Sequence, residues 1–353
     1  MPDVPCEKFS ATLNSIVREL LDRNINKNTI PQDVIFLKET VVTKLKQNNV
    51  VLNHGIMGST TEALRMISKT EYELHINLKL PFELTPIRDD DRPGFVLLKA
   101  SEELEHPAIV DGYLDQKAIK NWIYDSLKTI IFYNNFDYLK KEIEFKKFYR
   151  VVVPECSFKL TCLPVLEFNY SKWPLSAPDL TERNLISYPW YAVPQVNALI
   201  DQRSFLAWSP DWERCIMEMN PHYKKVELLI ISLLSNHDVT CPNLKYVIQT
   251  TMVHATLNQI IPSDLGDFLI FIIESLASHL KQDKLNPFFE SSFNLFRCVS
   301  AVEINYFYDV ATDLIVNLNQ CKSQALAEEN NQVVTPATSN ANWVPNLHKL
   351  FEL

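Results

Sequence analysis

The sequence predicts an α+β protein in which N-terminal helices and a mixed sheet are followed by a helical lobe. Two observations indicate this: apolar residues follow helical spacing up to about residue 46 and again beyond about residue 200, whereas the segments between alternate like strands. With 353 residues, the chain is long enough for two packed lobes. We place them at residues 1–200 and 201–353.

The first predicted elements are helices. From about Phe9 to Lys46 the apolar residues recur three and four positions apart, which is the period of an amphipathic helix. The segment Asn28-Thr-Ile-Pro31 interrupts the pattern, and a proline there ends or bends a helix. Two successive helices are therefore expected.

The next predicted elements are the strands of the sheet. The segment Glu73-Leu-His-Ile-Asn-Leu-Lys-Leu80 alternates strictly between polar and apolar residues, as a half-buried strand does. Three further segments share the β-branched and aromatic bias of strands: Phe95–Leu98, Tyr149–Val153 and Phe158–Phe168.

The second lobe is predicted from four apolar segments with helical period. They are Lys225–Leu234, Tyr246–Ile260, Leu265–Leu280 and Val302–Leu318. The composition of Ser323–Ala341, in which Gln, Asn, Ser and Thr replace apolar residues, is instead typical of disorder.

Charge and glycine content exclude several classes of function. Only five glycines occur in the chain, so neither a phosphate-binding loop nor a dinucleotide fingerprint is present. The net charge of −9 argues against a uniformly basic nucleic-acid binder, although lysines cluster at residues 138–147 and 224–225. Such runs are also typical of a solvated helix face.

Cysteine usage and the N-terminus predict a cytoplasmic protein. The seven cysteines are odd in number and scattered, so we expect a reducing compartment and no disulfide-linked partner. His237 and Cys241 lie four residues apart without a second pair nearby, so no zinc site is expected. The first ten residues lack an apolar signal region, and the longest apolar stretch, Phe268–Ile273, is too short to span a membrane.

The candidate chemistry lies in Gly58-Ser59 and in Glu71 and Glu73, at the start of the strictly alternating strand. Residues i and i+2 of a strand project from the same face, so the two carboxylates are expected side by side, where Mg²⁺ takes oxygen ligands. A two-metal site for phosphoryl transfer normally adds a third carboxylate. The Gly-Ser turn would offer an amide and a hydroxyl to phosphates. By themselves these features are equally typical of a solvent-facing strand and a turn.

A set of motifs in a fixed order is more specific than the Gly-Ser turn and the acidic pair alone. The set comprises Gly58-Ser59, Glu71–Pro81, Arg92-Pro-Gly-Phe-Val96, Leu163-Pro-Val-Leu-Glu-Phe168, Asn243-Leu-Lys-Tyr-Val-Ile-Gln-Thr250, Lys284-Leu-Asn-Pro-Phe-Phe289 and Ser292-Phe-Asn-Leu-Phe296. It resembles the cyclic GMP–AMP synthase-like receptors (the male-abnormal family) over about residues 50–300. The resemblance implies a nucleotidyltransferase core with a C-terminal helical lobe. It also implies Mg²⁺ or Mn²⁺, ATP and GTP as substrates, and a cyclic dinucleotide as product.

The chain departs from the family pattern at three positions. The resemblance implies a third metal-binding acid six residues before Glu167, where this sequence has Thr161. A threonine hydroxyl is neutral, so it neither balances a metal pair nor accepts a proton efficiently. Gln249 stands where the family has a phosphate-contacting lysine, and Ser275 stands where the synthase stacks an aromatic ring on a base. Without the resemblance, both would be interpreted as ordinary helix-surface residues.

The resemblance also indicates which branch of the family applies. Asn220-Pro-His-Tyr-Lys-Lys225 runs directly into a predicted helix without the zinc insertion of the vertebrate synthase, so no zinc is implied. Such members are usually activated by double-stranded RNA. Three hypotheses follow: an active cyclic dinucleotide synthase using Glu71 and Glu73, an inactive relative that binds nucleotide or RNA or regulates an active relative, and a developmental or scaffolding member without a ligand.

Overall fold

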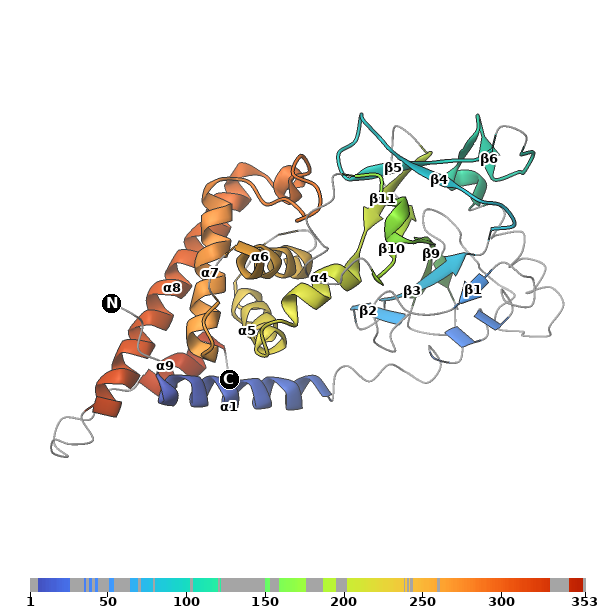
Figure 1. Cartoon of the computed structure of the whole chain (residues 1–353). Helices are drawn as coiled ribbons and strands as arrows, with labels where there is room; N and C mark the ends of the chain where they lie inside the picture. Colours follow the sequence, from blue (N-terminus) through green and yellow to red (C-terminus); the bar gives the residue numbers. More distant parts are fainter. Residues whose placement is uncertain are drawn as a thin grey trace. The chain divides into compact units, whose positions relative to one another are not determined.

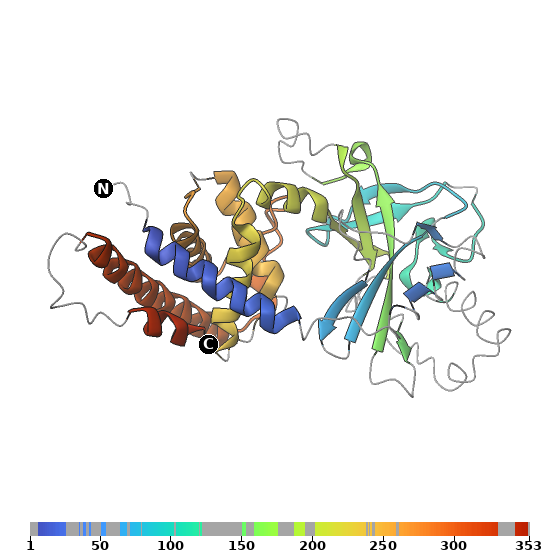
Figure 2. The same cartoon turned by 90° about the horizontal axis from the view of Figure 1, so that it is seen from below.

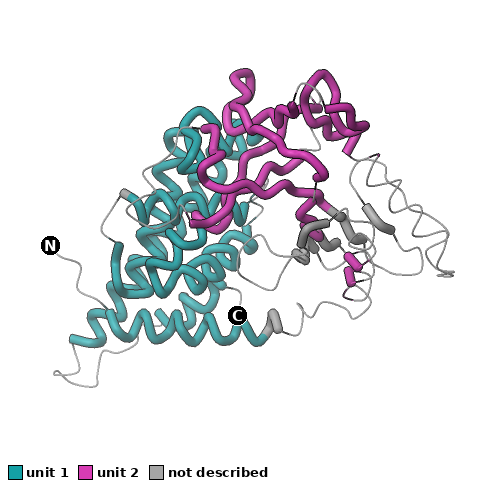
Figure 3. Tube along the Cα trace, turned by 45° about the vertical axis from the view of Figure 1, so that its right-hand side comes forward, with its two compact units in different colours: residues 1–26, 213–353 teal, residues 27–212 magenta. Residues whose placement is uncertain are grey.

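The computed structural model describes most of the sheet and nearly all of the helical region (Figure 1). The described residues are 6–25, 51–53, 64–68, 71–78, 80–101, 104–119, 150–152, 159–175, 187–194, 202–237, 244–258, 261–330 and 343–351, with a few isolated positions besides. Contacts divide the chain into two units, residues 27–212 and residues 1–26 with 213–353, shown in magenta and teal in Figure 3. The two units are described separately below.

One sheet organises the unit of residues 27–212. Its described strands are β1 (Val51–Asn53), β2 (Leu64–Ser68), β3 (Glu71–Leu78), β4 (Thr85–Arg88), β5 (Phe95–Lys99), β6 (Ile109–Val110), β7 (Tyr113–Leu114), β8 (Arg150–Val152), β9 (Lys159–Phe168), β10 (Trp190–Pro194) and β11 (Ser204–Trp208). The main order is β1-β3-β9-β10-β11-β5-β7-β6, with β2, β4 and β8 pairing β3, β5 and β9. The pair β3–β9 is parallel and the other described pairs are antiparallel, so the sheet is mixed, as predicted.

The apolar face of the sheet explains why these strands form. Leu74, Ile76 and Leu78 of β3 are buried on one face, and His75 and Asn77 between them are buried as well, so this part of the strand is covered on both faces and not half-buried as its alternation predicted. On β10, Trp190 is fully buried and stacks on Phe168 of β9, with ring centroids 4.9 Å apart. Such aromatic pairs add stability beyond the area that they bury. The strand includes Glu71 at its start, as the sequence predicted, and is described as far as Leu78.

The other unit consists of helices. They are α1 (Glu7–Ile25), α4 (Pro210–Met217, which crosses the division between the units), α5 (Tyr223–Ser235), α6 (Leu244–Asn258), α7 (Leu265–Lys281), α8 (Ala301–Asn330) and α9 (Trp343–Leu350). In Figures 1 and 2, α7 lies alongside α8, and α1 runs next to α8 and α9. The four helices predicted beyond residue 200 are thus present, and the chain has the predicted α+β class.

Helix α1 illustrates how the amphipathic pattern is used. Its buried residues are Phe9, Leu13, Ile16, Val17 and Leu20, which form one stripe along the helix. The ring centroid of Phe9 lies 6.3 Å from that of Trp343 in α9. Although α1 precedes the sheet in sequence, it is grouped with the helices of residues 213–353 rather than with the sheet. The second predicted N-terminal helix lies largely outside the described residues.

Polar contacts fix the start of α7 against α1 and α8. Asp264 caps α7 by accepting hydrogen bonds from the amides of Gly266 and Asp267. Its carboxylate also accepts a bond from the hydroxyl of Ser10, at 2.8 Å from Oδ1. Asp267 pairs with Lys322 of α8 at 2.5 Å, and both side chains are only 11% exposed.

The prediction of disorder from Ser323 onward is wrong for its first part. Helix α8 continues to Asn330, and Ala325 on this stretch is fully buried. Alanine and glutamate favour helix strongly enough to outweigh the polar composition of the segment. The remainder of the segment, residues 331–341, lies outside the described residues.

Candidate functional site

The candidate site begins with the parallel pairing of β3 and β9. In this register, Glu71 is paired with Lys159 and Glu73 with Thr161. Neighbouring residues in a parallel register lie on the same face of the sheet, as do residues two apart on one strand. Positions 71, 73 and 161, which we call the β3–β9 site, are therefore adjacent on one face of the sheet.

Not every predicted residue of this site falls within the described structure. Gly58 and Ser59 lie outside it, and for Glu71, Glu73 and Thr161 the description covers the backbone alone. The structure thus gives the positions of the two glutamates along the strand, and not the placement of their carboxylates. The structure adds that the hydroxyl-bearing residue, and not a third carboxylate, stands beside Glu73.

The next carboxylate along the same face of β9 belongs to Glu167. It lies six residues beyond Thr161, which is about 20 Å along an extended strand. Its Oε2 accepts a hydrogen bond of 2.9 Å from the amide nitrogen of Asn77, a residue that is 3% exposed. Because of this distance and this bond, Glu167 does not replace the missing carboxylate at position 161.

The surroundings of Glu167 shift its proton affinity. Desolvation by neighbouring protein atoms raises the pKa of the Glu167 carboxyl, the bond from Asn77 opposes this, and the charge of Asp211 adds to the rise. Tyr191, the cross-strand partner of Glu167, is 2% exposed, and burial followed by the charges of Glu167 and Asp211 raises the pKa of its phenol.

An apolar patch covers the middle of the same face. Its buried members are Val165, Tyr191 and Val193, and the partly exposed residues Leu163, Leu206 and Trp208 pack against them. The ring of His75 on β3 meets that of Trp208 edge-on, with centroids 5.9 Å apart. Because its central members are buried, this patch is part of the hydrophobic core and the middle of the face is covered.

Gln249 lies on α6 in the helical unit. Its amide nitrogen donates a hydrogen bond of 2.6 Å to Oε1 of Glu227 on α5. The same oxygen lies 3.9 Å from the ammonium of Lys245, one turn earlier on α6. The position that the family resemblance assigns to a phosphate-contacting lysine is here neutral, and its side chain is held by a carboxylate.

Ser275 lies on α7, and its hydroxyl donates to the carbonyl oxygen of Phe271 at 2.8 Å. Serine commonly makes this local hydrogen bond to the backbone in helices. Since the residue is a serine, no aromatic ring is available at this position to stack on a base. Gln249 and Ser275 belong to the helical unit, whereas Glu71, Glu73 and Thr161 belong to the sheet unit.

Sequence reasoning missed Glu227, which accepts a hydrogen bond from the predicted site residue Gln249, and Asn77, which donates one to Glu167 on the face of the β3–β9 site. Asn77 could have been identified, because it continues the alternate positions 71, 73 and 75 of the predicted strand. Glu227 lies on a different helix from Gln249, 22 residues away, and no spacing rule connects the two.

The described residues contain no metal cluster and no membrane-spanning helix. Among them, no group of three or more His, Cys, Asp or Glu side chains is arranged to hold a metal ion. Within the same residues, none of the helices is both long enough and apolar enough to cross a bilayer.

The mixed sheet and the helical unit are consistent with a nucleotidyltransferase-like α+β fold. The chain is similar to a cyclic GMP-AMP synthase-like protein of Drosophila melanogaster, with 27% identity over 329 residues, covering 87% of this chain and 94% of the relative. It is also similar to a cyclic GMP-AMP synthase-like receptor of Drosophila eugracilis, with 26% identity, covering 68% of this chain and 70% of the relative.

A third relative, a cyclic GMP-AMP synthase-like receptor of Microplitis demolitor, is 24% identical over 296 residues, covering 73% of this chain and 55% of the relative. No family model matches the chain. The three relatives support the resemblance of this chain to cyclic GMP-AMP synthase-like proteins.

Proposed function

We propose that this chain is a cyclic GMP–AMP synthase-like nucleotidyltransferase that senses double-stranded RNA and binds ATP and GTP, and that its catalysis is limited at Thr161. The names of its relatives supply the class. The observation that carries the catalytic part is the pairing of Thr161 with Glu73 in the parallel register of β3 and β9. This register supports a defect in the site itself rather than in a neighbouring segment.

The residues of the β3–β9 site fit one divalent cation better than two. Glu71 and Glu73 would supply hard oxygen ligands of the kind that Mg²⁺ and Mn²⁺ prefer. When bound, such an ion would neutralise the phosphates of a nucleoside triphosphate. A second ion needs a further carboxylate to bridge the pair, and the neutral hydroxyl of Thr161 supplies no charge for this.

Thr161 would then limit the removal of the proton from the attacking hydroxyl. A threonine hydroxyl has no lone pair basic enough to accept the proton of an attacking ribose hydroxyl near neutral pH. General-base catalysis typically contributes a factor of 10²–10⁴ to the rate, so its loss alone accounts for a very slow enzyme. Nucleotide binding, which depends on Glu71, Glu73 and the cation, would survive this loss.

A second candidate function is a catalytically inactive member that acts as a binding, regulatory or developmental scaffold protein. It is favoured by the hydrogen bond between Gln249 and Glu227, because a neutral amide occupied by a carboxylate offers no cation to a triphosphate. If catalysis is no longer required, loss of both the carboxylate at position 161 and the lysine at position 249 is expected.

Double-stranded RNA as activator and the cytoplasm as compartment are further parts of this proposal. The resemblance supports RNA as the activator, because the chain has no zinc insertion before α5. The odd number and scattered positions of the cysteines support a reducing compartment. Of the two lysine clusters, Lys224 and Lys225 lie in the first turn of α5, whereas residues 138–147 lie outside the described residues. Lys225 is already engaged, because its ammonium donates a hydrogen bond of 2.7 Å to the side-chain oxygen of Asn14.

The proposal is tested by product formation from labelled ATP and GTP with Mg²⁺ or Mn²⁺, with and without double-stranded RNA. Wild type and Glu71→Ala/Glu73→Ala are compared, and nucleotide binding is measured in parallel by titration calorimetry. We expect binding of triphosphate that requires the divalent ion, with little or no cyclic product, and loss of binding in the double variant.

Two other results would contradict the proposal in different ways. Rapid formation of cyclic product by wild type would show that Thr161 does not limit catalysis. No metal-dependent binding of triphosphate, together with no salt-sensitive binding of RNA, would leave the scaffold function instead.

A further inference from the structure

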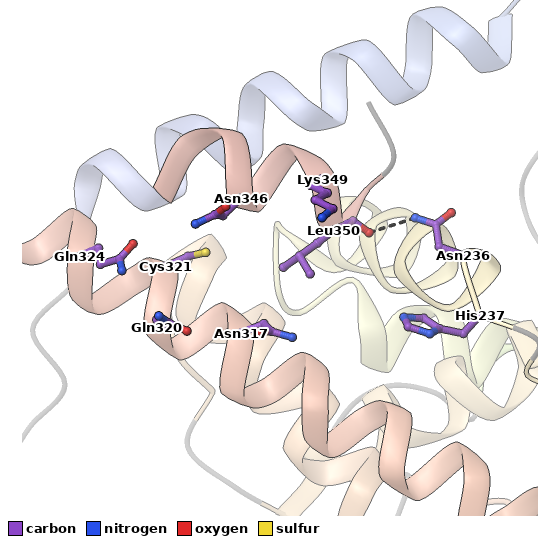
Figure 4. Close-up of a pocket in the computed structure, with 9 residues that line it drawn as sticks. All are labelled: Asn236, His237, Asn317, Gln320, Cys321, Gln324, Asn346, Lys349 and Leu350. Atoms are coloured by element: carbon purple, nitrogen blue, oxygen red, sulfur yellow. Dashed lines mark hydrogen bonds between the residues drawn. The ribbon is translucent and has the colours of Figure 1, made fainter. Parts of the chain in front are cut away.

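A pocket in the helical unit lies between α8, α9 and the turn that follows α5 (Figure 4). Its accessible volume is about 360 Å³, at the lower end of the usual range for small-molecule sites. The nine described lining residues all come from the unit of residues 213–353. The pocket is a different site from positions 71, 73 and 161, which belong to the sheet unit.

The lining of the pocket is unusually rich in carboxamides. Five of the nine lining residues are Asn or Gln, and α8 alone contributes Asn317, Gln320 and Gln324, spaced so that they follow one face of the helix. A carboxamide offers a donor and an acceptor in one plane, which is the pattern that pairs with the edges of nucleobases. Figure 4 shows Asn317 pointing toward His237 across the pocket.

The hydrogen-bonding capacity of these side chains is largely unused within the described residues. Asn236 donates to the carbonyl oxygen of Leu350 at 2.9 Å and so links the end of α5 to the end of α9. Asn317, Gln320, Gln324 and Asn346 make no such side-chain bond to another described residue. Asn236 therefore shapes the wall, while the other four amides remain available to a ligand.

The charge of the pocket favours an anion. Lys349 contributes an ammonium group, and none of the described lining residues carries a carboxylate, although acidic residues outnumber basic ones in the whole chain. Among the described residues Lys349 has no ion pair. Glu328, an acidic residue one turn after Gln324 on α8, is paired with Lys8 at 3.9 Å. His237 adds two ring nitrogens that can donate or accept.

We propose that this pocket binds a nucleoside monophosphate, with Lys349 contacting the phosphate and the carboxamides of α8 and α9 reading the edge of the base. The volume of the pocket is sufficient for one nucleotide. The site is independent of the β3–β9 site, so the helical unit would respond to a nucleotide without the chemistry of Glu71 and Glu73. The proposal does not depend on the function proposed above.

The test is titration calorimetry on the full chain with AMP and GMP as probes, alongside adenosine, guanosine and inorganic phosphate. Lys349→Gln removes the charge, and its matched control is Lys281→Gln, an exposed lysine in the last turn of α7. Asn317→Leu removes one amide, and its matched control is Asn319→Leu, an exposed amide of α8 outside the pocket. Glu71→Ala/Glu73→Ala separates this pocket from the β3–β9 site.

We expect at least one monophosphate to bind, with affinity at least tenfold weaker in Lys349→Gln and in Asn317→Leu and unchanged in both controls. Binding should persist in Glu71→Ala/Glu73→Ala, and the matching nucleoside and inorganic phosphate should each bind more weakly. No binding at millimolar concentrations, equal losses in the variants and their controls, loss in Glu71→Ala/Glu73→Ala, or equally tight binding of inorganic phosphate would each overturn the proposal.

Discussion

Thr161 of β9 is the direct neighbour of Glu73 of β3 in the only parallel pairing among the described strands. Position 161 is thus where a carboxylate from β9 would join the two carboxylates of β3 on the same face of the sheet. The chain keeps the strand pairing that brings the three positions together and lacks one charge. Under the function proposed above, the missing charge at this position, and not the strand pairing, limits catalysis.

The first prediction concerns Gln249. Replacing Gln249→Lys should strengthen the binding of ATP or GTP by about three- to tenfold, because a charged donor to phosphate is stronger than a neutral amide. The gain should be larger when Glu227→Gln is added, since Glu227 accepts a bond from position 249 and would otherwise pair with the new ammonium. Titration with triphosphate and Mg²⁺ measures both effects. Weaker binding in the double variant than in Gln249→Lys alone would contradict this account of Glu227.

A second prediction concerns the ion pair between Lys322 and Asp267. Lys322→Met should lower the free energy of unfolding by about 3 kcal/mol, because it leaves a nearly buried carboxylate without its partner. Adding Asp267→Asn should recover much of the loss, since the unpaired charge is then gone. Urea denaturation measures both. An additive effect of the two substitutions would show that the pair is not coupled.

The third prediction concerns Gly266 in the first turn of α7. Gly→Ala in a helix usually stabilises a protein by up to about 1 kcal/mol, but Gly266→Ala should destabilise this one. A Cβ at this position would lie 2.5 Å and 2.8 Å from two ring atoms of Phe9, which is fully buried. The penalty should shrink in a Phe9→Leu background. Thermal unfolding of the single and double variants checks this, and a stabilised Gly266→Ala would contradict the packing of α1 on α7.

A fourth prediction concerns the order in which thiols react. Burial raises the pKa of the Cys6 thiol and of the Cys241 thiol from 9.0 to about 11, with smaller contributions from Glu329 and Glu303 respectively. A rise of this size lowers the thiolate fraction near neutral pH by a factor of about 100. Cys298 is exposed, so it should be alkylated at least tenfold faster than either. Mass spectrometry after brief iodoacetamide treatment at pH 8 measures the order, and faster labelling of Cys6 would contradict it.

Much of the fold was predictable because the spacing of apolar residues that specifies its helices and strands is local. The buried stripe of α1 and the strand β3 follow from residue spacing, and the predicted α+β class with a mixed sheet is confirmed. The prediction of disorder at Ser323 was wrong because composition alone does not reveal that Ala325 packs into the helical unit. The grouping of α1 with helices about 200 residues later depends on tertiary contacts such as that between Ser10 and Asp264, which no local pattern encodes.

The site was predictable only in part. The adjacency of Glu71 and Glu73 follows from the two-residue period of a strand, and the choice of Thr161 as the third position came from the family resemblance. The register of β3 and β9 independently places Thr161 beside Glu73. The contacts of Gln249 with Glu227 and of Asn77 with Glu167 could not be predicted, because each joins side chains brought together only by the fold. The roles of Gly58, Ser59, Gln249 and Ser275 in nucleotide binding stay predictions.

The most direct test of the central claim is the rate of cyclic dinucleotide formation by Thr161→Asp, with labelled ATP and GTP, Mg²⁺ or Mn²⁺ and double-stranded RNA present. Thr161→Asn is the matched control, because it has nearly the same shape without the charge. If the missing carboxylate limits catalysis, Thr161→Asp should raise the rate by about 10²-fold or more over wild type, and Thr161→Asn should not. A Thr161→Asp variant that binds triphosphate and forms no more product than wild type would contradict the claim.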